Sequence, residues 1–246
     1  MLRPILAAAL TLLAAPAVAQ QGPPPGAWVS VSPAELPEPG RSVANPPRRV
    51  TRDAGEKPRV PEGFEATLFA EGLSHARWLH VAPNGDVFLA QSRADEITLL
   101  RDSDGDGRAD LVTPYATGFD TPHGMAIRDG WFYVADTEAV WRFPYEPGTP
   151  EAAGPRQQVT ADGALGSGAG HWTRGLVFDP SGERFFVAIG SRGNISIEEP
   201  PRATITAFDA DGSDPRTFAA GLRNPVGMAF RPGTDHLYTV VNERDG

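Results

Sequence analysis

The chain has 246 residues, a formal net charge of −9 at neutral pH and no cysteine. The acidic balance, without any long basic run, argues against nucleic acid or an anionic membrane as its partner. The lack of cysteine excludes disulfides and a lipid-anchor thiol. The chain's one lysine, Lys57, lies in a region that we interpret as a linker. The repeats described below therefore offer no lysine amine for nucleophilic chemistry.

The N-terminus has the pattern of an export signal. Arg3 supplies the positive charge, residues 5–13 form a short apolar run, and Ala17-Val18-Ala19 matches a small-x-small cleavage site. We therefore predict a signal peptide at residues 1–19 and a periplasmic or secreted protein. No later segment approaches the length of about 18 apolar residues that a membrane span needs.

Residues 20–62 are rich in proline and glycine and lack a sustained hydrophobic period. This composition is typical of an extended arm. Regular patterning begins near residue 63, and residues 64–70 (FEATLFA) alternate as a strand does. We therefore predict one β-rich domain over residues 63–246.

A motif recurs along this domain. His75, His123 and His171 stand 48 residues apart, and each precedes an apolar stretch, a turn and a second apolar stretch. A fourth copy follows 52 residues after His171, where Arg223 and Asn224 take the place of the histidine. Short strands at a period of 40–50 residues are typical of β-propeller blades. The chain is thus predicted to be an all-β propeller with about four blades.

The polar residues of the motif predict a central pocket. Propeller blades are related by rotation about one axis, so residues at the same phase of successive blades face the same place. A single histidine is more often a residue that satisfies the backbone of a turn. A set continued by an Arg-Asn pair favours a pocket, and we expect His75, His123, His171 and Arg223 to point toward one axis.

The fourth unit has only its first two strands before the sequence stops at residue 246. Natural sheets avoid an open edge of this kind. We therefore expect the chain to be a C-terminally truncated copy of a longer protein, and its function to be that of the longer protein.

Two segments carry a resemblance to a known family. Residues 168–194 (GAGHWTRGLVFDPSGERFFVAIGSRGN) and 218–246, in which GLRNPVG is followed by NERDG, resemble the glucose/sorbosone dehydrogenase family. The likeness is to its sorbosone-dehydrogenase-like branch and extends over roughly residues 64–246. It implies a six-bladed parent propeller that binds pyrroloquinoline quinone (PQQ) and calcium. It also implies oxidation of a sugar or aldehyde, with a separate electron acceptor that the sequence does not identify.

The same resemblance implies roles for individual residues. His171 matches the family's catalytic base, which removes the hydroxyl proton while hydride leaves for the quinone, a task suited to imidazole. Arg223 matches an arginine that contacts the quinone and stabilises its developing charge. Asn224 matches a neighbouring cofactor contact, and Asn194 is a further cofactor candidate.

Other positions complete this candidate site. His123 stands where relatives have a substrate-contacting amide, and Trp172, beside the base, is a candidate for stacking on a sugar. The main-chain carbonyls of Glu243, Arg244 and Asp245 are candidate ligands of the cofactor's calcium, because calcium prefers hard oxygen donors. The family's cofactor-polarising lysine and later arginines have no counterpart in this chain.

A second metal signal is independent of the family. Asp102, Asp104, Asp106 and Asp110 occupy positions 1, 3, 5 and 9 of a calcium-type loop, with Gly107 at position 6. The glutamate expected at position 12 is missing. The loop is either a structural calcium site or an ordinary acidic turn, and the sequence leaves both open.

Two other functions compete with the quinone enzyme. His75, His123 and His171 could hold zinc or iron in a propeller hydrolase or lactonase. A propeller that keeps the fold without the cofactor would be a non-catalytic binding protein. Bound PQQ with calcium would support the first function, a transition metal the second, and neither ligand the third.

Overall fold

The computed structural model describes residues 55–243, together with residues 27–30, 32, 34, 48, 50, 51 and 53. The chain divides into two units, residues 1–40 and 41–246, and the strands found among the described residues belong to the second unit. The predicted signal peptide at residues 1–19 lies outside the described residues, as does much of the predicted arm at 20–62. In the part of the chain that is described, no helix is long and apolar enough to cross a membrane.

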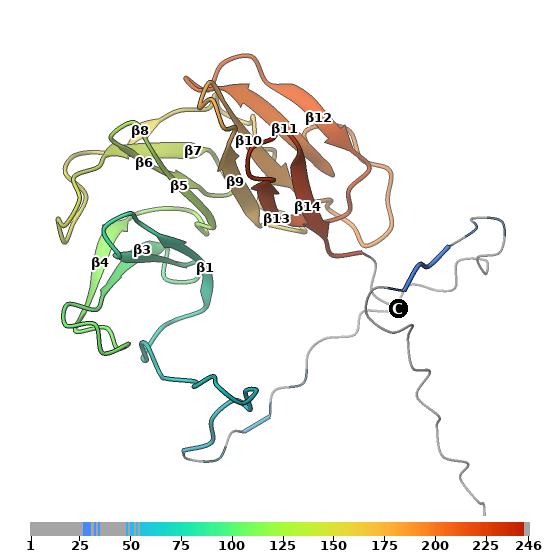
Figure 1. The fold of residues 1–246 in the computed structure, drawn as a ribbon. Coiled ribbons are helices and arrows are strands. Elements are labelled where there is room, and N and C mark those ends of the chain that lie inside the picture. Colours follow the sequence, from blue (N-terminus) through green and yellow to red (C-terminus); the bar gives the residue numbers. More distant parts are fainter. Residues whose placement is uncertain are drawn as a thin grey trace, which may run out of the picture. The chain divides into compact units, whose positions relative to one another are not determined.

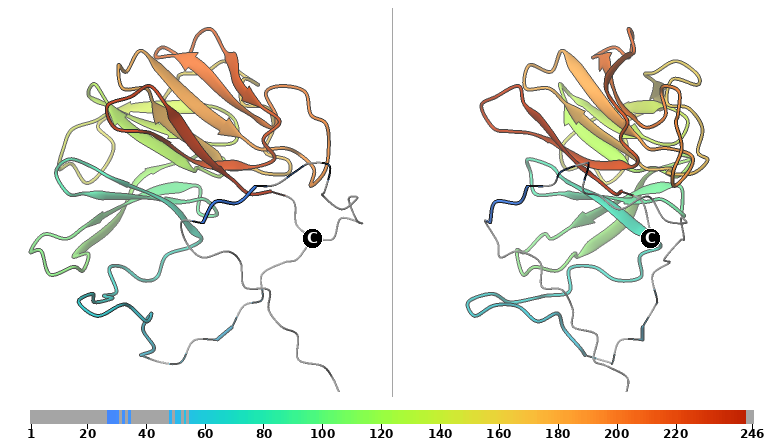
Figure 2. Two further views of the ribbon diagram at one scale, coloured as in Figure 1. Left: turned by 45° about the vertical axis from the view of Figure 1, so that its right-hand side comes forward. Right: turned by 90° about the vertical axis from the view of Figure 1, so that its right-hand side faces the viewer.

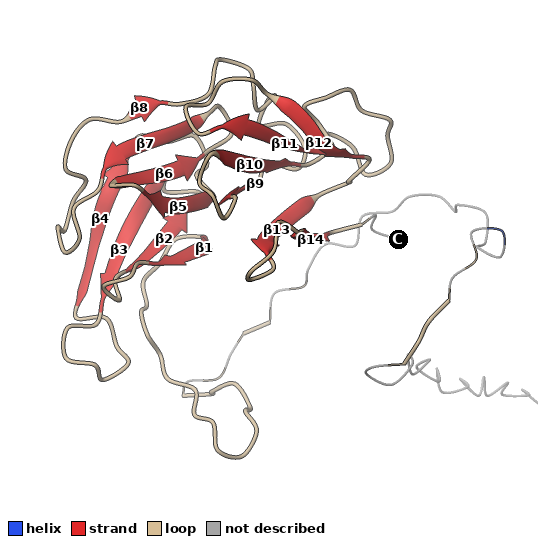
Figure 3. Cartoon of the chain, turned by 45° about the horizontal axis from the view of Figure 1, so that its top comes forward, coloured by secondary structure: helices blue, strands red, loops and turns tan. Residues whose placement is uncertain are grey.

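The strands form four antiparallel sheets, and each sheet follows chain order (Figures 1 and 3). We call the sheets blades 1 to 4. Blade 1 contains β1 (Ala76–Val81), β2 (Val87–Gln91), β3 (Glu96–Arg101) and β4 (Leu111–Thr117). Blade 2 contains β5 (Gly124–Arg128), β6 (Trp131–Ala135), β7 (Val140–Pro144) and β8 (Gln157–Gln158). Blade 3 contains β9 (Arg174–Phe178), β10 (Arg184–Ile189), β11 (Thr204–Asp209) and β12 (Arg216–Ala220), and blade 4 contains β13 (Pro225–Phe230) and β14 (Leu237–Val241).

The first strand of each blade lies innermost. β1 contacts β5, β5 contacts β9, and β9 contacts β13, so the blades follow one another around a common centre (Figures 1 and 2). Successive meander sheets with touching inner strands are the architecture of a β-propeller. The predicted propeller is confirmed, and the fourth unit has the two strands that its repeat predicted.

Alternation along each strand gives every blade two apolar faces. In β6, Phe132 and Val134 join the cluster shared with blade 1, whereas Tyr133 and Ala135 join the cluster shared with blade 3. Full burial of a side chain such as Phe132 or Val134 stabilises the fold by about 1.5–3 kcal/mol. Blades 2 and 3 are therefore packed on both sides.

Three clusters of buried apolar side chains lie between consecutive blades. The cluster between blades 1 and 2 includes Phe88, Ile97, Leu99, Phe132, Val134 and Phe143. The cluster between blades 2 and 3 includes Tyr133, Val140, Leu176, Phe185, Val187 and Phe208. The cluster between blades 3 and 4 includes Phe186 and Ile205, against which Met228 and Phe230 pack.

We compare the inner strands at one position of the repeat, which we call the reference position. It pairs with Ala90, Ala135, Ala188 and Val240 of the second strands. It lies three residues before the last hairpin pair in blades 1, 3 and 4, and four residues before it in blade 2. The residues at the reference position are Trp78, Gly124, Gly175 and Gly227.

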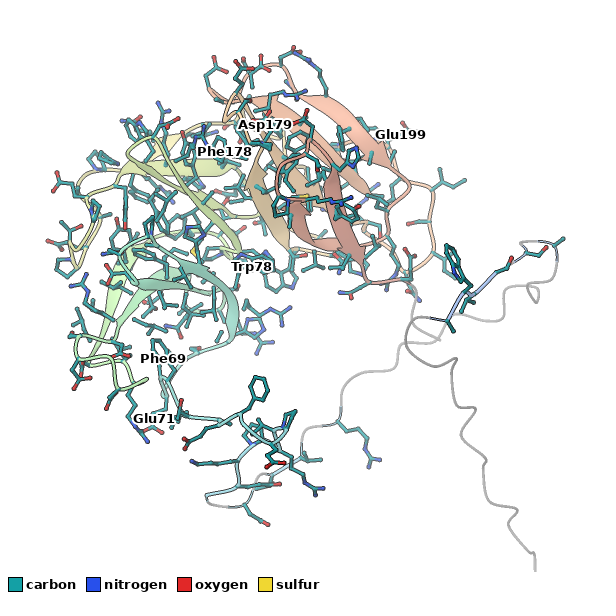
Figure 4. The ribbon with its side chains drawn as sticks, in the orientation of Figure 1. Phe69, Glu71, Trp78, Phe178, Asp179 and Glu199 are labelled. Carbon is teal, nitrogen blue, oxygen red and sulfur yellow. The ribbon has the colours of Figure 1, made fainter. Side chains whose placement is uncertain are left out.

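Glycine is needed at two of these positions because there is no room for a side chain. A Cβ at Gly124 would stand 2.4 Å from the carbonyl oxygen of Arg174, and one at Gly175 would stand 2.6 Å from that of Val226. Blade 1 differs, since its reference residue is Trp78. The Trp78 indole extends from β1 toward β13 (Figure 4), 4.0 Å from where a Cβ of Gly227 would stand.

One predicted strand is absent from the structure. Residues 64–70 form no ladder, and Phe64 is 73% exposed. Phe69 O accepts a backbone hydrogen bond of 2.8 Å from Ala109 N, in the loop between β3 and β4. An alternating pattern becomes a strand only beside a partner strand that takes up its backbone groups, and this segment has none among the described residues.

Candidate functional site

Two of the predicted site residues meet at Ser191, which follows β10. The Ser191 N–H donates to the carbonyl oxygen of Arg223 at 2.7 Å. Its own carbonyl oxygen accepts from the His171 backbone N–H at 3.0 Å and from His171 Nδ1 at 2.8 Å. A carbonyl only accepts, so Nδ1 carries the proton and Nε2 is the basic nitrogen of the neutral ring. One main-chain segment therefore orients the proposed base and joins it to Arg223.

Arg223 is oriented by main-chain and amide oxygens. Its Nε donates to Asn194 O at 3.1 Å, its Nη2 donates to Asn194 Oδ1 at 2.5 Å, and its Nη1 donates to Asn242 O at 3.1 Å. Donation along several edges fixes the plane of a guanidinium. The structure thus brings together Arg223 and Asn194, the two cofactor contacts predicted from different blades.

The loop that presents Asn194 is held by Glu198. The Glu198 carboxylate accepts from the backbone N–H of Arg192 at 2.7 Å and of Gly193 at 3.2 Å, and from Ser196 Oγ at 2.7 Å. Burial raises the pKa of Glu198, but these hydrogen bonds outweigh it and lower the pKa to about 2. Glu198 is therefore ionised at any physiological pH.

Asn224 packs beside His171. The side chain is buried, and its Oδ1 accepts from Thr173 Oγ1 at 3.3 Å. Gly190 makes this approach feasible, because a Cβ there would stand 2.5 Å from His171 Cβ and 2.8 Å from Asn224 Oδ1. The base and the predicted amide thus share one closely packed corner between blades 3 and 4.

A pocket of about 410 Å³ opens beside this corner. Its walls include Ser191, Asn194, Glu198, Arg223 and Glu243. Glu243 is thus near the other predicted cofactor residues. Arg244 and Asp245 lie outside the described residues, so their proposed carbonyl ligation of calcium stays a prediction.

Trp172 lies at the centre of an aromatic cluster near the propeller axis. Its ring centroid is 5.9 Å from that of His75 and 5.8 Å from that of His123, and Arg77 Cζ lies 5.4 Å from the Trp172 centroid. His123 in turn lies 5.1 Å from Trp78. The cluster therefore joins side chains from blades 1, 2 and 3, and Trp172 is the chain neighbour of His171.

Part of this cluster faces a pocket of about 740 Å³, which we call the axial pocket. His75 and Trp172 line it together with Asp120, Thr121, Thr137 and Gly168. His75 and Thr121 have left-handed backbones, with φ of 55° and 57°. That conformation is costly for a β-branched residue such as Thr121 and is common at functional sites. The position of Trp172 suits its predicted role of stacking on a sugar.

His123 does not face this pocket. Its side chain is 1% exposed, and its Nδ1 is buried without a hydrogen-bond partner. Burial lowers the pKa of His123 to about 4, with a smaller contribution from the charges of Arg77 and Arg174. A neutral ring without exposed surface cannot contact a substrate directly. The predicted substrate role of His123 is therefore replaced by a packing role between Trp78 and Trp172.

The strand register also corrects the predicted phase of the polar residues. His171 and Arg223 each precede the reference position of their blade by four residues, as equivalent residues should. His75 precedes its reference position by three residues and His123 by only one. Spacing along the chain counts the linking loops, whose lengths differ, so equal spacing did not mean equal register.

The three histidines do not form a metal site. Among the residues that the structure describes, the one cluster of histidine and acidic side chains with metal-ligand spacing is Asp102, Asp104 and Asp106. His75, His123 and His171 are all described and belong to no such cluster. The three-histidine metal site that the hydrolase alternative requires is therefore not formed by these side chains.

The acidic loop lies at the turn between β3 and β4. Ligand oxygens of Asp102, Asp104 and Asp106 lie within 4.8 Å of one another. Asp102 accepts from the backbone N–H groups of Gly105 and Gly107 at 2.7 and 2.9 Å, and these bonds lower its pKa, Gly107 most. Asp110 is not part of the cluster, and its Oδ2 accepts from Ser103 N at 2.7 Å. Three of the four predicted ligands are thus brought together.

Sequence reasoning missed two buried arginines that hold the loop before the base. Arg174 is fully buried and donates to the carbonyls of Leu165, Ser167 and His171 at 3.1, 2.8 and 3.2 Å. Arg202 donates to Ser167 and Ala169. Burial lowers the pKa of Arg174 to about 9, which leaves it charged at neutral pH. For Arg174, the signal in the sequence was the pair Arg174-Gly175 at the start of a strand. It places a charged residue where a buried apolar residue is expected.

Ser191 was also missed, because its contribution is made mainly by its backbone. A Gly-Ser pair directly after the buried strand β10 was the available signal. It marks close approach of the main chain rather than a reactive hydroxyl.

The sequence of this chain is similar to a protein family and to a curated relative. A family described as TrAA12-like matches residues 58–246. A curated relative, an uncharacterized protein of Borreliella burgdorferi, is 19% identical over 196 residues, which are 76% of this chain and 50% of the relative. The chain thus spans about half the length of that relative.

Three solved structures show the same fold. The holo PQQ domain of a pyranose dehydrogenase from Coprinopsis cinerea is 22% identical with a TM-score of 0.67, over 76% of this chain and 48% of that one. A family AA12 carbohydrate-active enzyme from Trichoderma reesei is 22% identical with a TM-score of 0.62, over 75% and 50%. The PQQ-bound aldose sugar dehydrogenase of Streptomyces coelicolor is 18% identical with a TM-score of 0.51, over 69% and 57%.

Proposed function

The chain belongs to the TrAA12-like family, and from this membership we propose that it takes part in oxidising a sugar with PQQ as the cofactor. Two proteins of similar fold, the pyranose dehydrogenase domain and the aldose sugar dehydrogenase, are described with PQQ. The observation that carries the proposal is the hydrogen bond from His171 Nδ1 to Ser191 O, 2.8 Å. Because Nδ1 donates this hydrogen bond, Nε2 is left as the basic nitrogen of His171. Arg223, which precedes blade 4, is joined to the same residue, Ser191.

The side chains present suit PQQ. This cofactor is a planar quinone with three carboxylates, so its site needs fixed cationic and amide donors. Arg223 and Asn194 provide them at the wall of the 410 Å³ pocket, and Asn224 lies beside His171. Glu198 and Glu243 also line that pocket. A divalent cation would offset their charge beside an anionic cofactor, which supports the prediction of calcium at this place.

The roles of the chain's own residues follow from this geometry. His171 Nε2 takes the proton of the substrate hydroxyl as the carbon is oxidised. Arg223, whose guanidinium plane is fixed, stabilises negative charge next to it. Trp172 offers a ring against which a sugar face packs. PQQ, when bound, supplies the acceptor for the two electrons that leave the substrate.

We also propose a substrate class, a location and an electron acceptor. The substrate is an aldose or a sorbosone-like sugar, and the protein acts in the periplasm or outside the cell. A separate protein or small molecule is the final electron acceptor. Residues 1–19 support export by their sequence.

The test combines cofactor binding with turnover, in protein expressed from its complete gene. We expect His171→Ala to lower turnover by about 10²–10⁴-fold, the usual contribution of a general base, while affinity for PQQ changes little. Arg223→Ala should weaken both PQQ binding and turnover. The absorbance of bound quinone and a dye-linked sugar assay measure the two effects.

The matched control is His236→Ala, which removes an exposed histidine between β13 and β14. It should leave both measurements unchanged. If the wild-type protein binds neither PQQ nor calcium, the quinone function is wrong and the non-catalytic binding propeller replaces it.

A further inference from the structure

A second pocket adjoins the axial pocket. This pocket of about 440 Å³, which we call the distal pocket, is lined by Asp120, Thr137, Glu138, Trp141, Gln158 and Asp162. Asp120, Thr137 and Gly168 line both pockets and separate them. We call the two neighbouring pockets together the groove; their lining extends from Trp172 to Gln158 of the outer strand β8.

The boundary between the two pockets is a fixed structural feature. The Thr137 hydroxyl donates to the Asp120 carboxylate, and Thr137 N donates to Asp120 O at 3.0 Å. Gly168 packs against the same threonine, because a Cβ at Gly168 would stand 3.3 Å from the Thr137 side chain. A larger residue at position 168 would have to displace Thr137 and change the boundary between the two pockets.

One buried carboxylate organises the distal pocket. Asp136 is fully buried, and its Oδ2 accepts from Asp120 N at 3.1 Å and from Trp141 Nε1 at 2.8 Å. Its Oδ1 accepts from Glu138 N at 2.9 Å. Three residues of the pocket wall are thus held by a single side chain. Such support is typical of a site whose groups are preorganised for a ligand.

The chemistry of the walls points to a carbohydrate. Asp120, Glu138 and Asp162 supply carboxylates, which accept two hydrogen bonds and suit paired hydroxyls. Gln158 adds an amide oxygen, while its Nε2 donates to Thr160 O and Asp162 Oδ1 at 2.9 and 2.7 Å. Trp141 adds an indole ring. Arg156 Cζ lies 4.1 Å from the Trp141 centroid and fixes that ring. The described residues that line this pocket include no basic side chain, so anionic sugars are disfavoured.

We propose that the distal pocket is a second sugar subsite, and that the substrate is a neutral oligosaccharide whose reacting unit occupies the axial pocket. The inference rests on the proposed function, because that function places the oxidised sugar beside Trp172 and His171. It adds a class of substrate, a chain of at least two sugar units. It also adds specificity residues from blade 2 that lie outside the corner formed by His171 and Arg223.

Calorimetric titration of the same full-length protein tests the proposal without requiring turnover. The probes are the neutral disaccharides cellobiose, maltose, lactose and laminaribiose, with glucose and galactose as their component sugars. We expect at least one disaccharide to bind more tightly than either monosaccharide. Glu138→Ala and Asp162→Ala should each lower the ratio of disaccharide to monosaccharide affinity by about tenfold, the size of one hydrogen bond to a charged group.

The matched control is Glu183→Ala, an exposed carboxylate of the hairpin between β9 and β10 that leaves the groove intact. Thermal melts confirm that each variant is folded. The subsite is wrong if no disaccharide exceeds its monosaccharides, if the two groove variants leave the ratio unchanged, or if digalacturonic acid binds more tightly than the neutral probes. Quinone titration of the same preparation is independent, so failure of the cofactor proposal is scored separately.

Discussion

His123 shows what burial does to an ionisable side chain. Its ring packs against Trp78 and Trp172, and its pKa of about 4 lies below the ordinary value of 6.5. The unfolded chain takes up a proton as the pH falls through about 6.5, whereas the folded ring stays neutral down to about 4. Unfolding is therefore favoured progressively across that window.

We expect this histidine to cost the fold about 3 kcal/mol of stability between neutral pH and pH 4. His123→Phe keeps an aromatic ring between the two indoles and removes the titration. The loss of stability between pH 7 and pH 4, measured by urea unfolding, should be smaller in the variant than in the wild-type protein.

The same substitution at the exposed His236 is the control and should reproduce the wild-type profile. Parallel profiles for His123→Phe and the wild-type protein would show that burial does not lower the pKa of His123 in the folded state.

At the scale of elements, the glycines of the inner strands determine how closely the blades pack. Gly124→Ala would place a Cβ 2.4 Å from the carbonyl oxygen of Arg174, and a backbone atom in a strand cannot move aside cheaply. We expect a loss of about 2 kcal/mol, as in other overpacked cores, and a fall of about 4–8 °C in the melting temperature.

Gly154→Ala is the matched control for that prediction. Its Cβ would lie 3.6 Å from the nearest atom, in the side chain of Pro144, which is ordinary contact. A melting temperature equally lowered in both variants would mean that the loss arises from glycine replacement in general rather than from blade packing.

The acidic loop between β3 and β4 makes a separate prediction. We expect calcium to bind Asp102, Asp104 and Asp106 and to raise the melting temperature. At a calcium concentration 100 times the dissociation constant, binding adds about 2.7 kcal/mol to the free energy of unfolding. Asp104→Asn should reduce the gain, because calcium prefers charged oxygen ligands. Differential scanning calorimetry with and without calcium measures it.

Asp235→Asn, an exposed carboxylate of the β13–β14 hairpin, serves as the control for charge. A melting temperature that does not respond to calcium would identify the loop as an ordinary acidic turn.

For the whole molecule, we expect stability to vary from blade to blade. Blades 2 and 3 bury both faces, whereas Leu79 and Val81 of β1 are 59% and 63% exposed and Val240 of β14 is 69% exposed. Amides of β6 and β10 should therefore exchange with deuterium at least roughly 10²-fold more slowly than those of β1 and β14. Uniform protection in all four blades, measured by mass spectrometry of peptides, would contradict this.

The propeller could be predicted because its repeat is long and its strands are apolar, and both features are visible in one chain. Arg223 pairs with Asn194, and His171 lies close to Asn224, because the motifs that carry these residues stand at the ends of neighbouring strands. Their roles stay predictions. Strand register could not be read from chain spacing, since it depends on hairpin pairing and loop length. The burial of His123 and the clamp by Arg174 depend on neighbouring blades, whose packing a local pattern does not encode.

The three apolar clusters have a consequence for how the chain folds. Each of the three clusters joins only consecutive blades, so the packing within them forms between segments that are neighbours in the sequence. Folding can then propagate from one blade to the next, as in repeat proteins whose units stabilise their neighbours. A blade that pairs its hairpin in the wrong register would present the wrong face to the blade that follows and stop this propagation. A shift in register would also move Gly124 and Gly175 away from the positions where the neighbouring strand leaves no room for a Cβ, and would bring a side chain there instead.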